Sequence, residues 1–96
     1  MIKPTVGRVI WFYTPAMNKD SQPYAAFITY VHSDMMINVG GFDHNGVPFG
    51  STSVLLLSDA ESYGNPGGGA WAKWMPYQLG QAAKTEAAEA AIRTES

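Results

Sequence analysis

The chain has 96 residues, a formal net charge of −2, 46% hydrophobic residues and only 15% charged ones. This length allows one small domain and excludes two cores of ordinary size. The six Lys and Arg residues are scattered along the chain, which excludes a protein that holds duplex DNA through a stripe of phosphate contacts. Without cysteine there is no disulfide framework, thiol nucleophile or cysteine-based zinc site. No apolar run approaches the roughly 18–20 residues of a membrane span, so we expect no membrane partner.

The large side chains divide the chain into two parts. All three Trp, five Tyr and four Phe residues lie between Trp11 and Tyr77, and the sequence after them is rich in alanine. We therefore expect a β domain over 1–79 and an Ala-rich tail over 80–96 that is partly helical or disordered, because isolated helices of this length are marginal in water.

Segments rich in β-branched and aromatic residues predict five strands. In chain order they cover 6–13, 24–32, 36–42, 51–57 and 71–75. The proline-containing stretch 14–23 predicts a loop, and Asn45-Gly46 predicts a tight hairpin after the third strand. The pair Gly40-Gly41 predicts a bulge or sharp bend, and 58–70 predicts a mobile, glycine-rich loop.

These elements predict a mainly β fold, a small antiparallel five-stranded SH3-like barrel or curled sheet with a short Ala-rich C-terminal helix. A barrel removes the free strand edges that an open sheet would expose. The alternative is an open sheet that a second subunit completes. The thin core of so short a chain also favours a homo-oligomer.

Neither histidine is placed for catalysis. His32 precedes Ser33-Asp34, but successive strand side chains point to opposite faces, and His44 lies in the predicted hairpin turn. The segment 64–69 is glycine-rich but lacks the Lys-Ser/Thr ending of a phosphate loop, although its backbone N–H groups could contact an anion. We therefore expect no enzyme activity, no metal site and no cofactor.

The most informative segment is Trp71-x-Lys73-Trp74-x-Pro76-Tyr77-Gln78. In a strand Trp71 and Lys73 share one face and Trp74 takes the other, so one tryptophan is expected at the surface or in an interface. Two interpretations stay open: this tryptophan packs under the long loop or against another subunit, or it forms the aromatic wall of a ligand pocket. The candidate ligand-binding residues are Trp11, Tyr13, Arg8, Trp71, Lys73, Trp74, Tyr77 and Gln78. Asn38 is an alternative to Gln78 as the donor of directional hydrogen bonds to the ligand.

Four stretches resemble short proteins of tailed bacteriophages. They are the opening 2–12, the middle 25–39 with Val31-His32-Ser33-Asp34, the turn Phe42-Asp43-His44-Asn45-Gly46, and the closing Trp74-Met75-Pro76-Tyr77-Gln78-x-Gly80-Gln81-Ala82. The resemblance carries no activity motif. It implies action in the host bacterial cytoplasm and, by analogy of class, a role against host defences.

Two functions follow as hypotheses. The first is a non-catalytic phage anti-defence binding protein that sequesters a small nucleotide-type immune signal in an aromatic-lined pocket. The second is a protein-interaction module, either an inhibitor of a host defence protein or a virion accessory protein, in which the outward tryptophan is a hot-spot anchor. The weak charge favours a small ligand or a protein partner over a nucleic-acid polymer.

Overall fold

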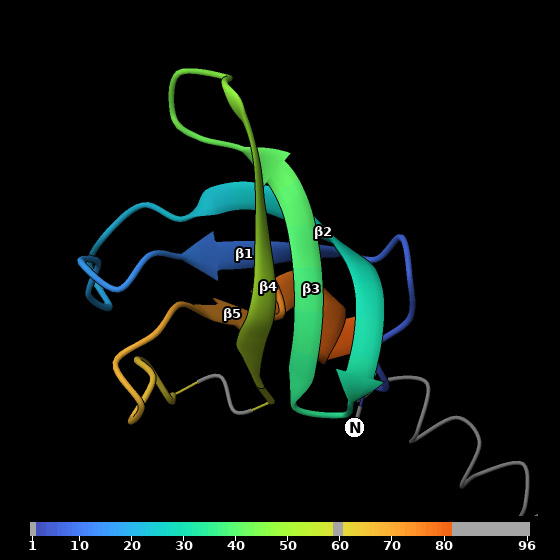
Figure 1. Cartoon of the computed structure of the whole chain (residues 1–96). Coiled ribbons are helices and arrows are strands. Elements are labelled where there is room, and N and C mark those ends of the chain that lie inside the picture. Colours follow the sequence, from blue (N-terminus) through green and yellow to red (C-terminus); the bar gives the residue numbers. More distant parts are fainter. Residues whose placement is uncertain (1, 59–60, 82–96) are drawn as a thin grey trace, which may run out of the picture.

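The computed structural model describes residues 2–58 and 61–81, which form a closed five-stranded β-barrel (Figure 1). The strands are β1 (Val9–Tyr13), β2 (Tyr24–Ser33), β3 (Met36–Phe42), β4 (Pro48–Leu57) and β5 (Trp71–Lys73). The prediction of a small barrel is confirmed. The open-sheet alternative is wrong, because β5 pairs with both β1 and β4 and so closes the ring within one chain. The predicted tail from residue 82 onward lies outside the described residues.

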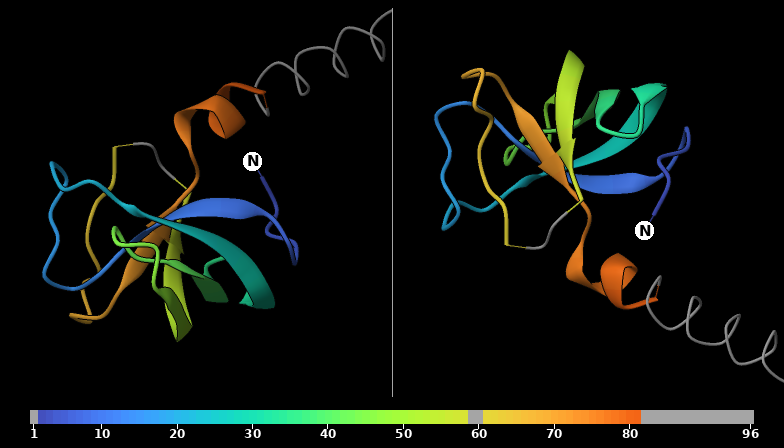
Figure 2. Two further views of the ribbon diagram at one scale, coloured as in Figure 1. Left: turned by 90° about the horizontal axis from the view of Figure 1, so that it is seen from above. Right: turned by 90° about the horizontal axis from the view of Figure 1, so that it is seen from below.

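An odd number of strands determines how the barrel closes. The pairs β1–β2, β2–β3, β3–β4 and β5–β1 are all antiparallel, and a ring of five strands must then contain one parallel pair. That pair is β4–β5. Parallel neighbours need a long crossover connection, and the described part of that connection, 61–70, runs outside the barrel to the start of β5 (Figures 1 and 2).

The core fills the inside of the barrel with alternate residues of each strand. The members of this cluster are Ile10, Phe12, Ala26, Ile28, Ile37, Val39, Val54, Leu56, Ala72 and Trp74. Burying a large apolar side chain contributes about 1.5–3 kcal/mol, so this cluster is the main source of stability. On β4, Val54 and Leu56 are fully buried while Leu55 and Leu57 are half-buried on the outer face.

At Gly41 the backbone of β2 lies too close to β3 to leave room for a side chain. A Cβ atom at this position would overlap the carbonyl oxygen of Ala25 and lie 2.7 Å from Ala26 Cα. Of the bulge or sharp bend predicted at Gly40-Gly41, the bulge is wrong, because the β2–β3 register is continuous through both residues. Gly41 is instead required because no side chain fits between the two backbones.

The bulges lie elsewhere and change which residues face the core. The β2–β3 register shifts between Ile28 and Tyr30 and again between Val31 and Ser33. A bulge turns the following side chains to the other face, so Val31 packs against the core while Tyr30 is 56% exposed.

A third shift lies between β3 and β4 at Asn38. Opposite it, Ser53 adopts a left-handed backbone with φ 55°, and its N–H donates to Asn38 Oδ1 at 2.9 Å. The Asn38 side chain thus replaces the ladder hydrogen bond that the bulge removes.

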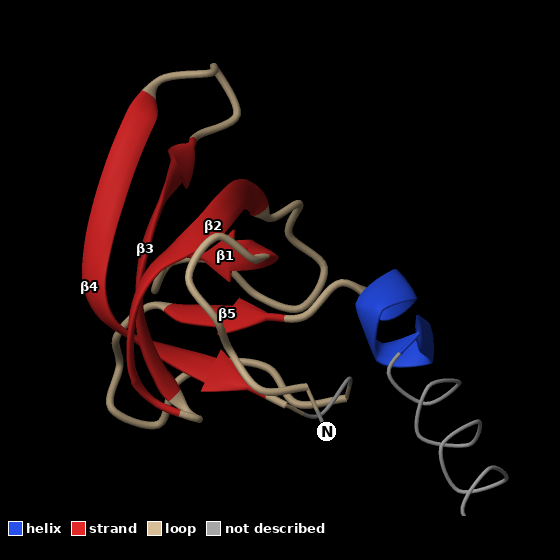
Figure 3. Ribbon diagram, turned by 90° about the vertical axis from the view of Figure 1, so that its right-hand side faces the viewer, coloured by secondary structure: helices blue, strands red, loops and turns tan. Residues whose placement is uncertain are grey.

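The start of the first predicted strand and the end of the last one also differ from the structure. β1 begins at Val9 rather than at residue 6, because a turn at Gly7 (φ 93°) precedes it. β5 ends at Lys73, and a helical turn covers Pro76–Gln81 (Figure 3). No helix within the described residues is long and apolar enough to cross a membrane.

The adjacent glycines give a matched test of the barrel's closure. We expect Gly41→Ala to lower the free energy of unfolding by about 3 kcal/mol, since its methyl group has no space and the strands must separate. Gly40→Ala is the control, because its Cβ would make ordinary contacts at 3.5 Å or more. Urea unfolding followed by tryptophan fluorescence measures both, and equal losses for the two variants would contradict the close approach at Gly41.

Candidate functional site

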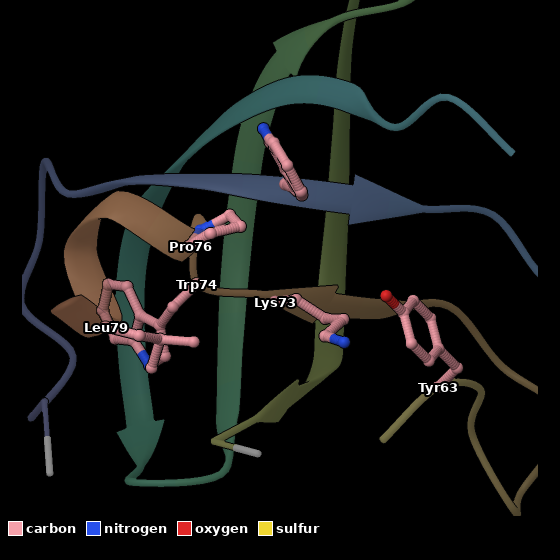
Figure 4. Close-up of a pocket in the computed structure, with 6 residues that line it drawn as sticks. Tyr63, Lys73, Trp74, Pro76 and Leu79 are labelled. Carbon is pink, nitrogen blue, oxygen red and sulfur yellow. The ribbon is translucent and has the colours of Figure 1, made fainter. Parts of the chain in front are cut away.

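A shallow pocket lies on the outside of the barrel where β1, β5 and the helical turn meet (Figure 4). Its volume is about 40 Å³, and its lining residues are Trp11, Tyr63, Lys73, Trp74, Pro76 and Leu79. Of the candidate ligand-binding residues, the pocket brings together Trp11, Lys73 and Trp74. Tyr63, Pro76 and Leu79 were not among the candidates. For Pro76 alone the sequence carried a signal, namely its position two residues after Trp74.

The lysine of the pocket is covered. Lys73 is 4% exposed, and its Nζ lies 3.4 Å from the centre of the Tyr63 ring. This geometry is a cation–π contact, which stabilises a desolvated ammonium group by about 2 kcal/mol. Figure 4 shows the Tyr63 ring beside the end of the Lys73 side chain. Lys73 is therefore held within the fold rather than displayed to a ligand.

Tyr13 and Trp71 form a second aromatic layer on the outer face of the barrel. Their rings stack with centroids 5.2 Å apart and planes inclined by 1°, and the Tyr63 ring contacts Tyr13 edge-on at 6.3 Å. Both residues are 3% exposed. The Trp71 indole Nε1 has no hydrogen-bond partner among the described residues.

The expectation that one tryptophan lies at the surface or in an interface is wrong. Trp74 belongs to the core, and Trp71, although it faces outward from the barrel, is 3% exposed and stacks on Tyr13, which Tyr63 of the long connection contacts edge-on. The outward tryptophan is buried within the single chain, and the interpretation that it packs under the long loop stays a prediction. Neither Tyr13 nor Trp71 lines the pocket.

The glycine-rich part of the connection is folded around one side chain. The Asn65 side chain accepts the N–H of Gly67 through Oδ1 at 2.9 Å and donates from Nδ2 to Ala70 O at 3.0 Å. The main-chain carbonyl oxygen of Asn65 accepts the N–H of Gly68 at 2.8 Å. The segment thus forms a hydrogen-bonded turn rather than an irregular loop. Two of the N–H groups that could contact a phosphate are already occupied.

Gln78 is a clamp between the helical turn and β1. Its Nε2 donates to Val9 O at 2.7 Å, and its Oε1 accepts the N–H of Met75 at 2.9 Å. Both ends of the amide are therefore used within the fold. Tyr77, the neighbouring candidate, is 72% exposed and does not line the pocket.

Arg8 lies just before β1 and is exposed. Its Cζ atom is 5.9 Å from the centre of a Trp74 ring, which places the guanidinium against an indole that also lines the pocket. Of the two cations among the candidates, Arg8 is the one that solvent reaches.

Each histidine makes a structural contact. His32 Nε2 lies 2.9 Å from Asn38 Oδ1, and its ring contacts Tyr30 edge-on. His44 Nε2 lies 2.8 Å from Gln22 O and 3.2 Å from Pro23 O, so it joins the β3–β4 hairpin to the loop 14–23. Within 2–58 and 61–81 no group of three His, Cys, Asp or Glu side chains could hold a metal ion.

A scan against protein-family models found no match, and searches of curated proteins and of solved structures found none either. The resemblance to short phage proteins and the functions that it implies therefore stay predictions.

The clamp residue and its neighbour give a matched test. We expect Gln78→Ala to lower the free energy of unfolding by about 1–2 kcal/mol, because two hydrogen bonds are lost and the Val9 carbonyl is left without its partner. Tyr77→Ala is the control, and as an exposed substitution it should change stability by less than about 0.5 kcal/mol. Chemical denaturation of both variants measures this, and the reverse order would show that the ring of Tyr77, not the amide of Gln78, holds the turn.

Tyr13 predicts an alkaline loss of stability. Burial, and the neighbouring Tyr63 phenol, raise the pKa of Tyr13 above its usual value of 10.0. Its contribution is fully present below pH 10 and is lost as the pH rises through the raised pKa, because the unfolded chain releases the proton first. We expect Tyr13→Phe to reduce the fall in unfolding free energy between about pH 9 and about pH 11, while the exposed-site control Tyr30→Phe keeps the wild-type slope. Identical slopes for all three proteins would contradict the buried phenol.

Proposed function

We propose that the chain is a protein-interaction module that binds one apolar side chain of a partner in the pocket between β1, β5 and the helical turn. The volume of the pocket carries this proposal. Sites for small organic molecules enclose about 300–1,000 Å³, whereas about 40 Å³ holds roughly three water molecules or part of one side chain.

The chemistry of the lining supports the same conclusion. Trp11, Trp74, Pro76 and Leu79 supply apolar surface, and the charge of Lys73 is covered by Tyr63. Aromatic residues at the centre of an interface typically act as hot spots. Trp11 is half-buried and lies opposite Lys73 in the β1–β5 register, so part of its side chain is open to a partner at this edge of the pocket.

Sequestration of a nucleotide-type signal stays a prediction and has a stricter requirement. Stacking a base and binding its phosphates needs a wider cavity and exposed donors, and Lys73 and Gln78 have their polar groups within the fold. A nucleotide site would therefore have to include residues of a second subunit. The test therefore also includes titration with cyclic nucleotides, the ligands that the nucleotide hypothesis predicts.

The test uses the three tryptophans as reporters. Short peptides are selected from a random displayed library on the full chain, and each is titrated into the ¹⁵N-labelled protein while the indole N–H signals are recorded. We expect the signals of Trp11 and Trp74 to shift and that of Trp71, which does not line the pocket, to stay unchanged. Trp11→Ala should weaken binding at least tenfold, about 1.4 kcal/mol, while Tyr30→Ala, an exposed aromatic outside the pocket, should not.

Two results would overturn the proposal. One is that selected peptides bind wild type and Trp11→Ala equally. The other is that calorimetric titration gives saturable heat with cyclic di- or trinucleotides or cyclic ADP-ribose isomers while no peptide is selected, which would favour the nucleotide hypothesis. Circular dichroism of Trp11→Ala, and the indole shifts of the unmodified chain, separate loss of binding from loss of fold.

A further inference from the structure

The exposed cation beside the pocket has a fixed backbone. The N–H of Arg8 donates to Thr5 O at 3.2 Å, and its carbonyl oxygen accepts the N–H of Ile28 at 2.9 Å. The guanidinium itself lies against Trp74, 5.9 Å from Cζ to the ring centre. The Arg8 side chain thus extends from a hydrogen-bonded backbone to the buried indole, and solvent reaches it there.

The guanidinium has no acidic partner within residues 2–58 and 61–81. Its side chain makes no ion pair or hydrogen bond in the described part of the molecule, and the contact with Trp74 leaves its N–H donors to solvent. Lys73 differs, because it is buried beneath Tyr63. The positive charge that an approaching partner meets at this edge of the pocket is therefore that of Arg8.

We infer that the partner is an extended acidic peptide segment, which places a small apolar side chain in the pocket and a carboxylate on Arg8. The inference rests on the proposed function and names the chemistry of the partner. Arginine binds carboxylates through two parallel N–H···O bonds, a geometry that lysine does not offer. Because Trp74 contacts both the pocket and Arg8, the two partner groups lie about one indole apart. At roughly 3.3 Å per extended residue, the carboxylate lies about two to four residues from the apolar side chain.

The experiment compares peptide selections on three full-length chains. Wild type should enrich Asp or Glu about two to four residues from an apolar residue. Arg8→Gln should bind these acidic peptides at least tenfold more weakly, and Arg8→Glu should enrich Lys or Arg at the same place. The matched control is Lys3→Gln, which removes an exposed positive charge from the same N-terminal segment and should change affinity less than twofold.

The outcomes separate this inference from the proposed function. If peptides shift the Trp11 and Trp74 signals but show no acidic enrichment and bind Arg8→Gln as tightly as wild type, the inference is wrong and the pocket remains a binding site. A loss for Lys3→Gln equal to that for Arg8→Gln also contradicts it, since general charge attraction would then explain the preference. If no peptide depends on Trp11, both the inference and the proposed function fail.

Discussion

The odd number of strands in the barrel determines most of the side-chain packing on its outer surface. Five strands cannot close a ring with antiparallel pairs alone, so β4 and β5 run parallel. The connection from the end of β4 to the start of β5 must therefore run back along the outside of the barrel. The return places Tyr63 over Lys73 and against Tyr13, and together with Trp71 these side chains form a second layer of packing outside the core. Stacked and edge-on aromatic pairs contribute about 0.5–1.5 kcal/mol each beyond the area that they bury. A chain this short thus places aromatic side chains on both surfaces of one sheet.

The sequence predicted the elements but not this second layer. Strand positions follow from local composition, and Asn45-Gly46 correctly predicted the β3–β4 hairpin, where Gly46 has φ 78°. Alternation along the last strand also correctly separated Trp71 from Trp74. What alternation could not provide was the path of the connection 58–70, which depends on the closure of the whole ring. The inference that a face pointing away from the core is exposed therefore failed at Trp71.

The candidate site was predicted in part for the same reason. The segment after β5 correctly indicated the region, and Trp11, Lys73 and Trp74 do meet there. Tyr63 comes from the connection, and its position could not be deduced from spacing. Gln78 was interpreted as a ligand-binding side chain because an exposed amide is a good donor and acceptor, but Val9 and Met75 supply partners for both ends. Side chains that complete backbone hydrogen bonds look, in a sequence, like side chains that bind ligands.

The contact of His44 with the loop 14–23 has a consequence for how one end of the barrel is held. Both of its acceptors, Gln22 O and Pro23 O, are backbone carbonyls, so Nε2 must carry the hydrogen. The neutral imidazole with its hydrogen on Nε2 and the imidazolium both supply that hydrogen. The tie between the β3–β4 hairpin and this loop therefore excludes only the tautomer with its single hydrogen on Nδ1, which would turn a lone pair toward both carbonyl oxygens.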